Sequence, residues 1–159
     1  MPIVITATVD PQRSRVDART HHAKVISMDA DPPDGDDTAA GPKETLLAAL
    51  AGCTSMDVAS ILRKKRQVAE TYEIQVSGES AEAHPKVFTT IAVEHRISGA
   101  VEPEALRRSI ELSATRYCPI NAMLSAVATI EHRYRLTASD GSTLTGLVAI
   151  TGPAVSQVL

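Results

Sequence analysis

The chain has 159 residues, 43% apolar and 22% charged, which suits one soluble globular domain with a substantial core. Its formal net charge of -3 gives no general reason to expect a nucleic acid or an anionic membrane as partner. One Phe, three Tyr and no Trp argue against base-stacking platforms, so the core must come from Ala, Val, Ile and Leu.

The N-terminus has no basic stretch followed by an apolar one, so it does not resemble a signal peptide. The longest apolar run, LLAALAGC, is far shorter than the roughly 20 residues that span a bilayer. We therefore expect a cytoplasmic protein with no membrane partner. Its two cysteines are expected to be thiols, or a redox-cycling pair. Since the chain has neither a CxxC nor a Cys/His cluster, we expect no metal and no cofactor.

Residues 1–28 are predicted to form N-terminal strands, because IVITATV, SRVDART and AKVISMDA alternate and contain β-branched residues. An acidic loop follows at residues 29–41, with five Asp together with Pro and Gly. Because this charge is costly to bury, the loop is expected to be exposed and mobile.

A helix that contains Cys53 is expected over residues 42–66, and Pro42 is favourable at its first position. The first half of this segment is apolar on every side, which predicts a helix buried all round. The basic cluster RKKR at its end suits the negative end of the helix dipole.

Strands are expected within residues 71–98, a second helix over 103–117 and a final strand over 130–138. The tail, residues 139–159, stays unassigned. This order of strands, long helix, strands, helix and strand indicates the α+β class. No GxGxxG or P-loop motif supports a nucleotide-binding fold.

Three segments together resemble the OsmC/Ohr superfamily, in its OsmC-like, YhfA-type branch. They are GPKETLLAALAGCTSMDVASILRKKR, AHPKVFTTIAVEHRISG and LSATRYCPINAML. The resemblance covers roughly residues 18–136 and leaves the tail outside. It implies a single OsmC-like domain, residues 1–159, in an intertwined homodimer. Antiparallel sheets would wrap around two long central helices, with the cysteine sites at the subunit interface.

The resemblance also implies thiol-dependent reduction of organic hydroperoxides, and hence protection against peroxide stress. Cys53 would be oxidised to a sulfenic acid, Cys118 would condense with it to a disulfide, and an external dithiol reductant would restore both. Because the thiolate is the nucleophile, Cys53 needs a cationic partner. Arg19 is the candidate for this role, and Arg13 and Arg15 are alternatives.

Two positions depart from the peroxidase branches of the superfamily. Lys43 lies ten residues before Cys53, where those branches carry a Glu that orients the Arg. The neighbouring Glu44 is rotated from that position by about 100° on a helix. Asp57 lies one turn after Cys53, where an ionised carboxylate would raise the thiol pKa. Either Asp57 opposes peroxidase chemistry in this way, or it pairs with a basic group across the dimer.

Two other functions are alternatives to the thiol peroxidase. Both are binding functions, so the sequence does not decide whether the protein is an enzyme. The first is a non-catalytic dimer of the same fold that binds a small ligand, with Cys53 lining the cleft. The second is nucleic-acid binding through Arg63, Lys64, Lys65 and Arg66, which the acidic overall charge disfavours.

Overall fold

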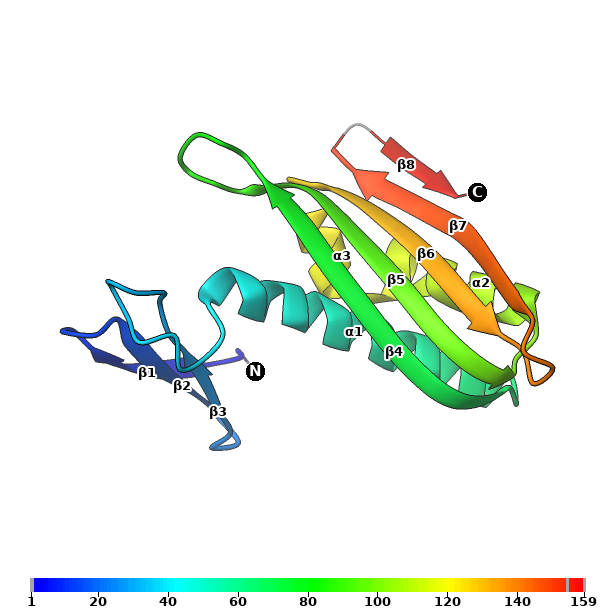
Figure 1. The fold of residues 1–159 in the computed structure, drawn as a ribbon, viewed down its shortest axis with the longest axis horizontal. Coiled ribbons are helices and arrows are strands. Elements are labelled where there is room, and N and C mark those ends of the chain that lie inside the picture. Colours follow the sequence, from blue (N-terminus) through cyan, green and yellow to red (C-terminus); the bar gives the residue numbers. More distant parts are fainter. Residues whose placement is uncertain (1, 154, 159) are drawn as a thin grey trace. The chain divides into compact units, whose positions relative to one another are not determined.

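The computed structural model describes residues 2–153 and 155–158, and its contacts divide the chain into two compact units, Met1–Leu46 and Leu47–Leu159. The first unit contains a three-stranded antiparallel sheet in the order β1-β2-β3 (Figure 1). Its strands are β1 (Ile5–Asp10), β2 (Arg15–Thr20) and β3 (Val25–Met28). All three lie within the segment where alternation predicts strands.

The acidic loop after β3 is organised around one of its own carboxylates. Asp29 is only 4% exposed and accepts hydrogen bonds from the hydroxyl of Thr38 at 2.6 Å and from its backbone N–H at 2.9 Å. The backbone N–H of Ala30 donates a third bond at 2.9 Å. The prediction that the loop would expose its charge is therefore wrong for Asp29, because donors that solvate a carboxylate allow its burial.

The long helix α1 (Pro42–Lys64) begins at the expected proline and has Arg63 and Lys64 in its last turn. Its buried residues recur every fourth position: Leu50, Thr54, Val58 and Leu62. The expectation of a helix buried all round is wrong for the single chain. Met56 is 73% exposed, and Ala48 and Ala49 are exposed as well. One side of α1 is thus in the core, and the other carries uncovered apolar residues.

By length and composition alone, α1 could cross a membrane, since an 18-residue window reaches a mean hydropathy of 1.6. The longest uninterrupted apolar run is too short to indicate this, because the hydropathy of α1 is spread over its whole length. Its buried face nevertheless packs in the core of the second unit. Leu50 contacts one apolar cluster there, and Val58 and Leu62 contact another. This packing identifies α1 as a core helix.

The second unit is built on a five-stranded sheet in the order β4-β5-β6-β7-β8. Its strands are β4 (Val68–Ser80), β5 (Phe88–Ala100), β6 (Thr129–Thr137), β7 (Thr143–Gly152) and β8 (Val155–Val158). The tail, unassigned from the sequence, thus supplies β7 and β8. Neighbouring strands are antiparallel except β5 and β6, which are parallel. The expectation of wholly antiparallel sheets is wrong for this pair, because a long helical crossover permits a parallel return.

That crossover contains α2 (Pro103–Leu112), a π-helical turn (Ser113–Tyr117) and α3 (Pro119–Leu124). Figure 1 shows α2 and α3 behind the sheet, on the face where α1 also packs. Two apolar clusters fill this side of the sheet. The first centres on Ile97, Leu106 and Ile110, and the second on Ile91, Val93 and Ile130.

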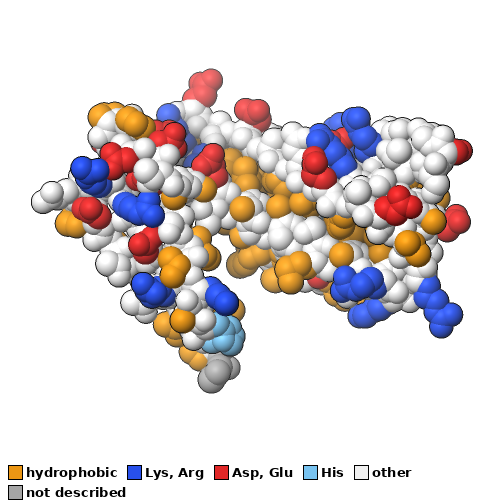
Figure 2. All heavy atoms as spheres, turned by 60° about the horizontal axis from the view of Figure 1, so that its bottom comes forward, with side chains coloured by type: hydrophobic (Ala, Val, Ile, Leu, Met, Phe, Trp, Pro, Cys, Tyr) orange, Lys and Arg blue, Asp and Glu red, His pale blue; other side chains and the backbone are white. Residues whose placement is uncertain are grey.

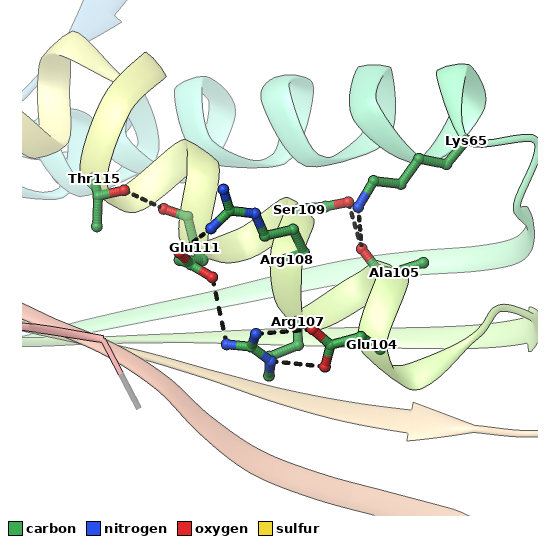
Figure 3. A network of polar contacts seen from close by, with 8 residues as sticks. All are labelled: Lys65, Glu104, Ala105, Arg107, Arg108, Ser109, Glu111 and Thr115. Atoms are coloured by element: carbon green, nitrogen blue, oxygen red, sulfur yellow. Dashed lines mark hydrogen bonds and ion pairs between the residues drawn. The ribbon is translucent and has the colours of Figure 1, made fainter.

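Figure 3 shows one polar contact from the end of α1 to α2 and a network of contacts within α2 and the turn that follows it. The Lys65 ammonium donates to the carbonyl of Ala105 at 3.3 Å. Arg107 forms ion pairs with Glu104 at 2.8 Å and with Glu111 at 3.4 Å. Exposed ion pairs contribute little stability individually. The Lys65 bond connects α2 to the end of α1, whereas the Arg107 ion pairs join successive turns within α2, the helix that leads into the π-helical turn and the second cysteine.

Candidate functional site

The two cysteines, 65 residues apart in the chain, meet in the second unit. The Sγ atoms of Cys53 and Cys118 lie 2.6 Å apart, and both residues are free thiols. A disulfide bond measures about 2.05 Å, so the sulfurs could bond after a small movement. Cys118 is 3% exposed whereas Cys53 is only partly buried, so Cys53 is the thiol more open to a reagent.

The surroundings of Cys53 favour its neutral form. Burial raises its pKa to about 11, and the neighbouring Cys118 and the charge of Asp57 act in the same direction. The backbone N–H of Ile120 opposes them and lowers the pKa. Cys53 is therefore protonated at neutral pH, and thiolate chemistry requires a further positive influence.

Cys118 lies at the junction of the π-helical turn and α3, where it is the N-cap residue. Its Sγ accepts hydrogen bonds from the backbone N–H of Asn121 at 3.3 Å and from the hydroxyl of Thr54 at 3.7 Å. The Asn121 side chain donates to the carbonyl of Ala114 at 2.7 Å. π-Helical turns often mark functional sites. Here the turn brings the Cys118 sulfur against Cys53.

Asp57 has a hydrogen-bond partner within the same chain. The Ser113 hydroxyl donates to Asp57 Oδ2 at 3.1 Å. One carboxylate oxygen of Asp57 and the two cysteine sulfurs all lie within 4.8 Å of one another. The carboxylate is therefore part of the cysteine site, as the helical spacing of Asp57 and Cys53 suggests.

The predicted cationic partners lie in the first unit, Met1–Leu46. Arg19 lies on β2, and its role beside Cys53 stays a prediction. The alternatives contact the acidic loop, since Arg13 pairs with Asp36 and Arg15 donates to the Thr38 hydroxyl. These contacts favour structural roles for Arg13 and Arg15.

The start of α1 explains Glu44 without reference to thiol chemistry. Its Oε2 accepts a hydrogen bond from the backbone N–H of Gly41 at 2.7 Å, which is the reciprocal half of a capping box. A role in orienting an Arg is not needed to account for this position. Lys43 precedes it in the exposed first turn.

A row of buried and partly buried polar residues adjoins the site, and no sequence motif connects it with the cysteines. Tyr72 OH lies 2.6 Å from Nδ1 of His95, and His132 Nε2 lies 2.8 Å from Oδ1 of Asn121. Burial lowers the pKa of both histidines, that of His132 to about 4, so both are neutral at pH 7. Asn121 links the row to Cys118 through its backbone N–H. Strand alternation, which puts His95 and His132 on the buried face, was the available signal.

Comparison with known proteins gives consistent matches. A family model described as OsmC-like protein matches residues 35–133, which contain both cysteines. Protein YhfA of Escherichia coli strain K12 is 36% identical over 104 residues, 65% of this chain and 78% of that protein. The crystal structure of a hypothetical protein from Aquifex aeolicus VF5 is similar with a TM-score of 0.74 and 25% identity, covering 87% of this chain and 98% of that chain. An organic hydroperoxide resistance protein OsmC from Legionella pneumophila shares the fold, with a TM-score of 0.62, 13% identity and coverage of 83% and 95%.

Proposed function

The chain belongs to the OsmC-like family, and from this premise we propose that it is a thiol-dependent redox protein that reduces organic hydroperoxides. The observation that carries the proposal is the 2.6 Å separation of the Cys53 and Cys118 sulfurs. A fold neighbour named as an organic hydroperoxide resistance protein supports the substrate class. The role would be protection against peroxide stress.

In this proposal the more accessible Cys53 reacts first. The Cys53 thiol loses its proton, and the thiolate attacks the terminal peroxide oxygen as the O–O bond breaks. The leaving alkoxide takes up a proton in place of the one the thiol lost, which gives a Cys53 sulfenic acid and an alcohol. The Cys118 sulfur then attacks the sulfenic sulfur, so that an S–S bond forms and water leaves. An external dithiol supplies two electrons and two protons, which return both cysteines to thiols. The net reaction converts one hydroperoxide and one dithiol into an alcohol, water and a disulfide.

We further propose that the uncovered side of α1 is buried in a homodimer. Figure 2 shows apolar side chains gathered over part of the second unit, with Lys and Arg side chains at the border. Met56, 73% exposed, is among the uncovered apolar residues of α1. A second copy would cover this side and produce the intertwined dimer with two central helices. The whole chain, residues 1–159, would then work as one OsmC-like domain, with Arg19 as the proposed activating cation for Cys53.

The proposed location is the cytoplasm. A reducing compartment suits two cysteines that must return to free thiols after each cycle. An external dithiol reductant would also be available there.

The test mixes the reduced protein with cumene hydroperoxide and counts free thiols and the alcohol formed. We expect the loss of two thiols per chain and one alcohol per disulfide. Cys53→Ser should abolish peroxide consumption, whereas Cys118→Ser should stop at a sulfenic acid that dimedone traps. Ser60→Ala, on the same helix, is the control and should behave like the wild type. Retention of both thiols after excess peroxide would contradict the proposal.

A non-catalytic dimer that binds a small ligand, with Cys53 lining the cleft, is the second candidate. The raised pKa of Cys53 favours it, because a protonated thiol is a poor nucleophile. In that case Cys53→Ser would leave ligand binding intact, and the protein would not consume peroxide.

A further inference from the structure

We propose that the reduced protein binds one thiophilic divalent cation, of the Zn²⁺ class, through Cys53, Cys118 and Asp57. The three ligand atoms, two sulfurs and a carboxylate oxygen, already lie within 4.8 Å of one another. This site goes beyond peroxide reduction and does not depend on it, because it requires only two thiols and a carboxylate.

The donor set matches what such an ion uses. Zn²⁺ binds cysteine sulfur and aspartate oxygen in tetrahedral sites, and three protein ligands leave the fourth position open to water or another ligand. Cys53 and Asp57 are four residues apart, so successive turns of α1 present both side chains on one face. Cys118 comes from the N-terminus of α3. A sequence scan for metal spacing misses this set, because its members come from two distant segments.

The charge of Asp57 supports a cation better than it supports a nucleophile. Beside a peroxidatic thiol the carboxylate is unfavourable, since its negative charge disfavours the Cys53 thiolate. Two thiolates and one carboxylate instead provide three negative charges toward a doubly charged ion. Cys118 is buried and Asp57 partly buried, which reduces the screening of this attraction by solvent.

Neighbouring groups already orient two of the three ligands. The Ser113 hydroxyl donates a hydrogen bond to Oδ2 of Asp57 at 3.1 Å and so limits the rotation of this carboxylate. Asn121 N–H and the Thr54 hydroxyl hold the Cys118 sulfur at 3.3 Å and 3.7 Å. Partners of this kind fix ligand orientation, and their loss typically reduces metal affinity about 10- to 100-fold.

Binding requires a small separation of the two sulfurs. With Zn–S bonds of about 2.3 Å in tetrahedral geometry, the sulfurs would lie about 3.8 Å apart. They are 2.6 Å apart here, so the gap must widen by about 1.2 Å for the bond lengths of a zinc site. A rotation of the partly exposed Cys53 side chain would provide this movement, while Cys118 stays in its hydrogen bonds.

The binding step needs no oxidant or reductant. Two thiols and one divalent cation give two metal–sulfur bonds and release two protons, so affinity falls as the pH is lowered. Metal binding and disulfide formation exclude each other, because both processes use the same two sulfurs. The reduced protein would bind the ion, and the disulfide form would not.

The test titrates Co²⁺, a spectroscopic substitute for Zn²⁺, into the fully reduced full-length protein without oxygen or added thiols. We expect a thiolate-to-cobalt charge-transfer band in the near ultraviolet and the visible bands of tetrahedral cobalt. Both should saturate at one ion per chain and disappear when Zn²⁺ displaces Co²⁺. Absence of these bands, with both thiols counted as free, would overturn the proposal.

Variants separate the three ligands. Cys53→Ser and Cys118→Ser should each lose the saturable site. Asp57→Asn keeps an acceptor for Ser113 and should keep the charge-transfer band, with affinity reduced about tenfold or more because a neutral amide oxygen replaces a charged ligand. Asp140→Asn, the same exchange at the exposed turn before β7, is the control and should bind like the wild type. If Asp57→Asn binds as tightly as Asp140→Asn, the assignment of Asp57 is wrong.

Two further measurements keep the outcome decisive. X-ray absorption of the wild-type complex should show that the cobalt ion has two sulfur neighbours and oxygen neighbours. This measurement does not depend on whether Asp57→Asn folds. Protein oxidised with diamide should not bind Co²⁺, and binding by it would overturn the proposal. Since diamide replaces peroxide here, a protein that fails to consume peroxide can still pass this test.

Discussion

At the level of single residues, the reactivity of Cys53 is governed by opposed local influences. Burial, the neighbouring Cys118 and the charge of Asp57 raise its pKa to about 11, and the backbone N–H of Ile120 lowers it. The charge of Asp57 is an influence that the isosteric substitution Asp57→Asn removes without opening a cavity. Its contribution to thiol reactivity is therefore measurable.

In a Cys118→Ser background, Asp57→Asn should lower the pKa of Cys53 and speed its alkylation by iodoacetamide at neutral pH. One pKa unit is a tenfold change in thiolate, and Asp57 is the smallest of the influences, so we expect an increase of less than about tenfold. The alkylation rate as a function of pH gives the midpoint. Asp140→Asn in the same background is the control, and an unchanged midpoint in Asp57→Asn would show that the charge does not act on Cys53.

Asp29 should make the first unit sensitive to acid. Hydrogen bonds from the Thr38 hydroxyl and backbone lower its pKa to about 2, below the value near 3.9 of an unfolded chain. Its stabilising contribution is thus complete above about pH 4 and is lost as the pH falls toward about 2. Limited proteolysis of residues 29–41 over this range should show an acid-induced opening that Asp29→Asn lacks. Asp31→Asn, at an exposed position, should retain it.

Gly35 is required for the same loop to close. A Cβ at this position would lie 2.2 Å from the carbonyl oxygen of Ala30 and 2.6 Å from Oδ1 of Asp29. Gly35→Ala should therefore displace the loop and accelerate its proteolysis at neutral pH. Gly141→Ala is not a suitable control, because Gly141 has a φ of +84°. Ala39→Gly, in the same loop, tests added flexibility without added volume, and equal proteolysis of Gly35→Ala and wild type would contradict this prediction.

At the level of elements, the periodicity of α1 predicted a helix, but the core-facing side had to be read from the structure. Leu50, Thr54, Val58 and Leu62 are buried, whereas Met56, on the other side of the helix, is 73% exposed. The segment is apolar all round, so no polar stripe indicates which side is outside. The side of α1 that packs against the five-stranded sheet becomes the buried side.

Leu50→Ala should destabilise the second unit by about 2–5 kcal/mol, because the fully buried side chain leaves a cavity beside Ile91 and Val93. Urea unfolding followed by circular dichroism measures the loss. Leu144→Ala is the matched control at a position that is 47% exposed, and it should cost less than about 1 kcal/mol. Equal losses would show that Leu50 is not a core residue in solution.

At the level of the whole molecule, the proposed homodimer rests on the uncovered apolar side of α1. Met56→Lys should shift the protein from dimer to monomer, because it places a charge at a site proposed to be buried between two copies. Sedimentation velocity measures the change. Val68→Lys, at an exposed position on β4, is the control and should leave the dimer intact. A monomeric wild type would refute the homodimer.

The sequence by itself determined the kinds of elements and the family. The alternation in β4 to β6 is a local pattern, as is the helix that begins at a proline. Such patterns can be recognised without the tertiary structure. The tail escaped assignment because the Gly- and Thr-rich β7 lacks a clear alternation of apolar and polar residues. The resemblance to OsmC-like proteins is carried by segments that include both cysteines, and the family match confirms it.

Only the tertiary structure decided which residues meet. The parallel return of β6 beside β5 and the π-helical turn before Cys118 bring that sulfur to 2.6 Å from Cys53. The same arrangement puts Ser113 against Asp57 and so makes the carboxylate part of the site. Such contacts join positions more than fifty residues apart and depend on strand register and crossover length. Local periodicity contains neither quantity. The spacing of Cys53 and Asp57 predicted that they share a face of α1, but only the folded chain shows that Cys118 and Ser113 approach that face.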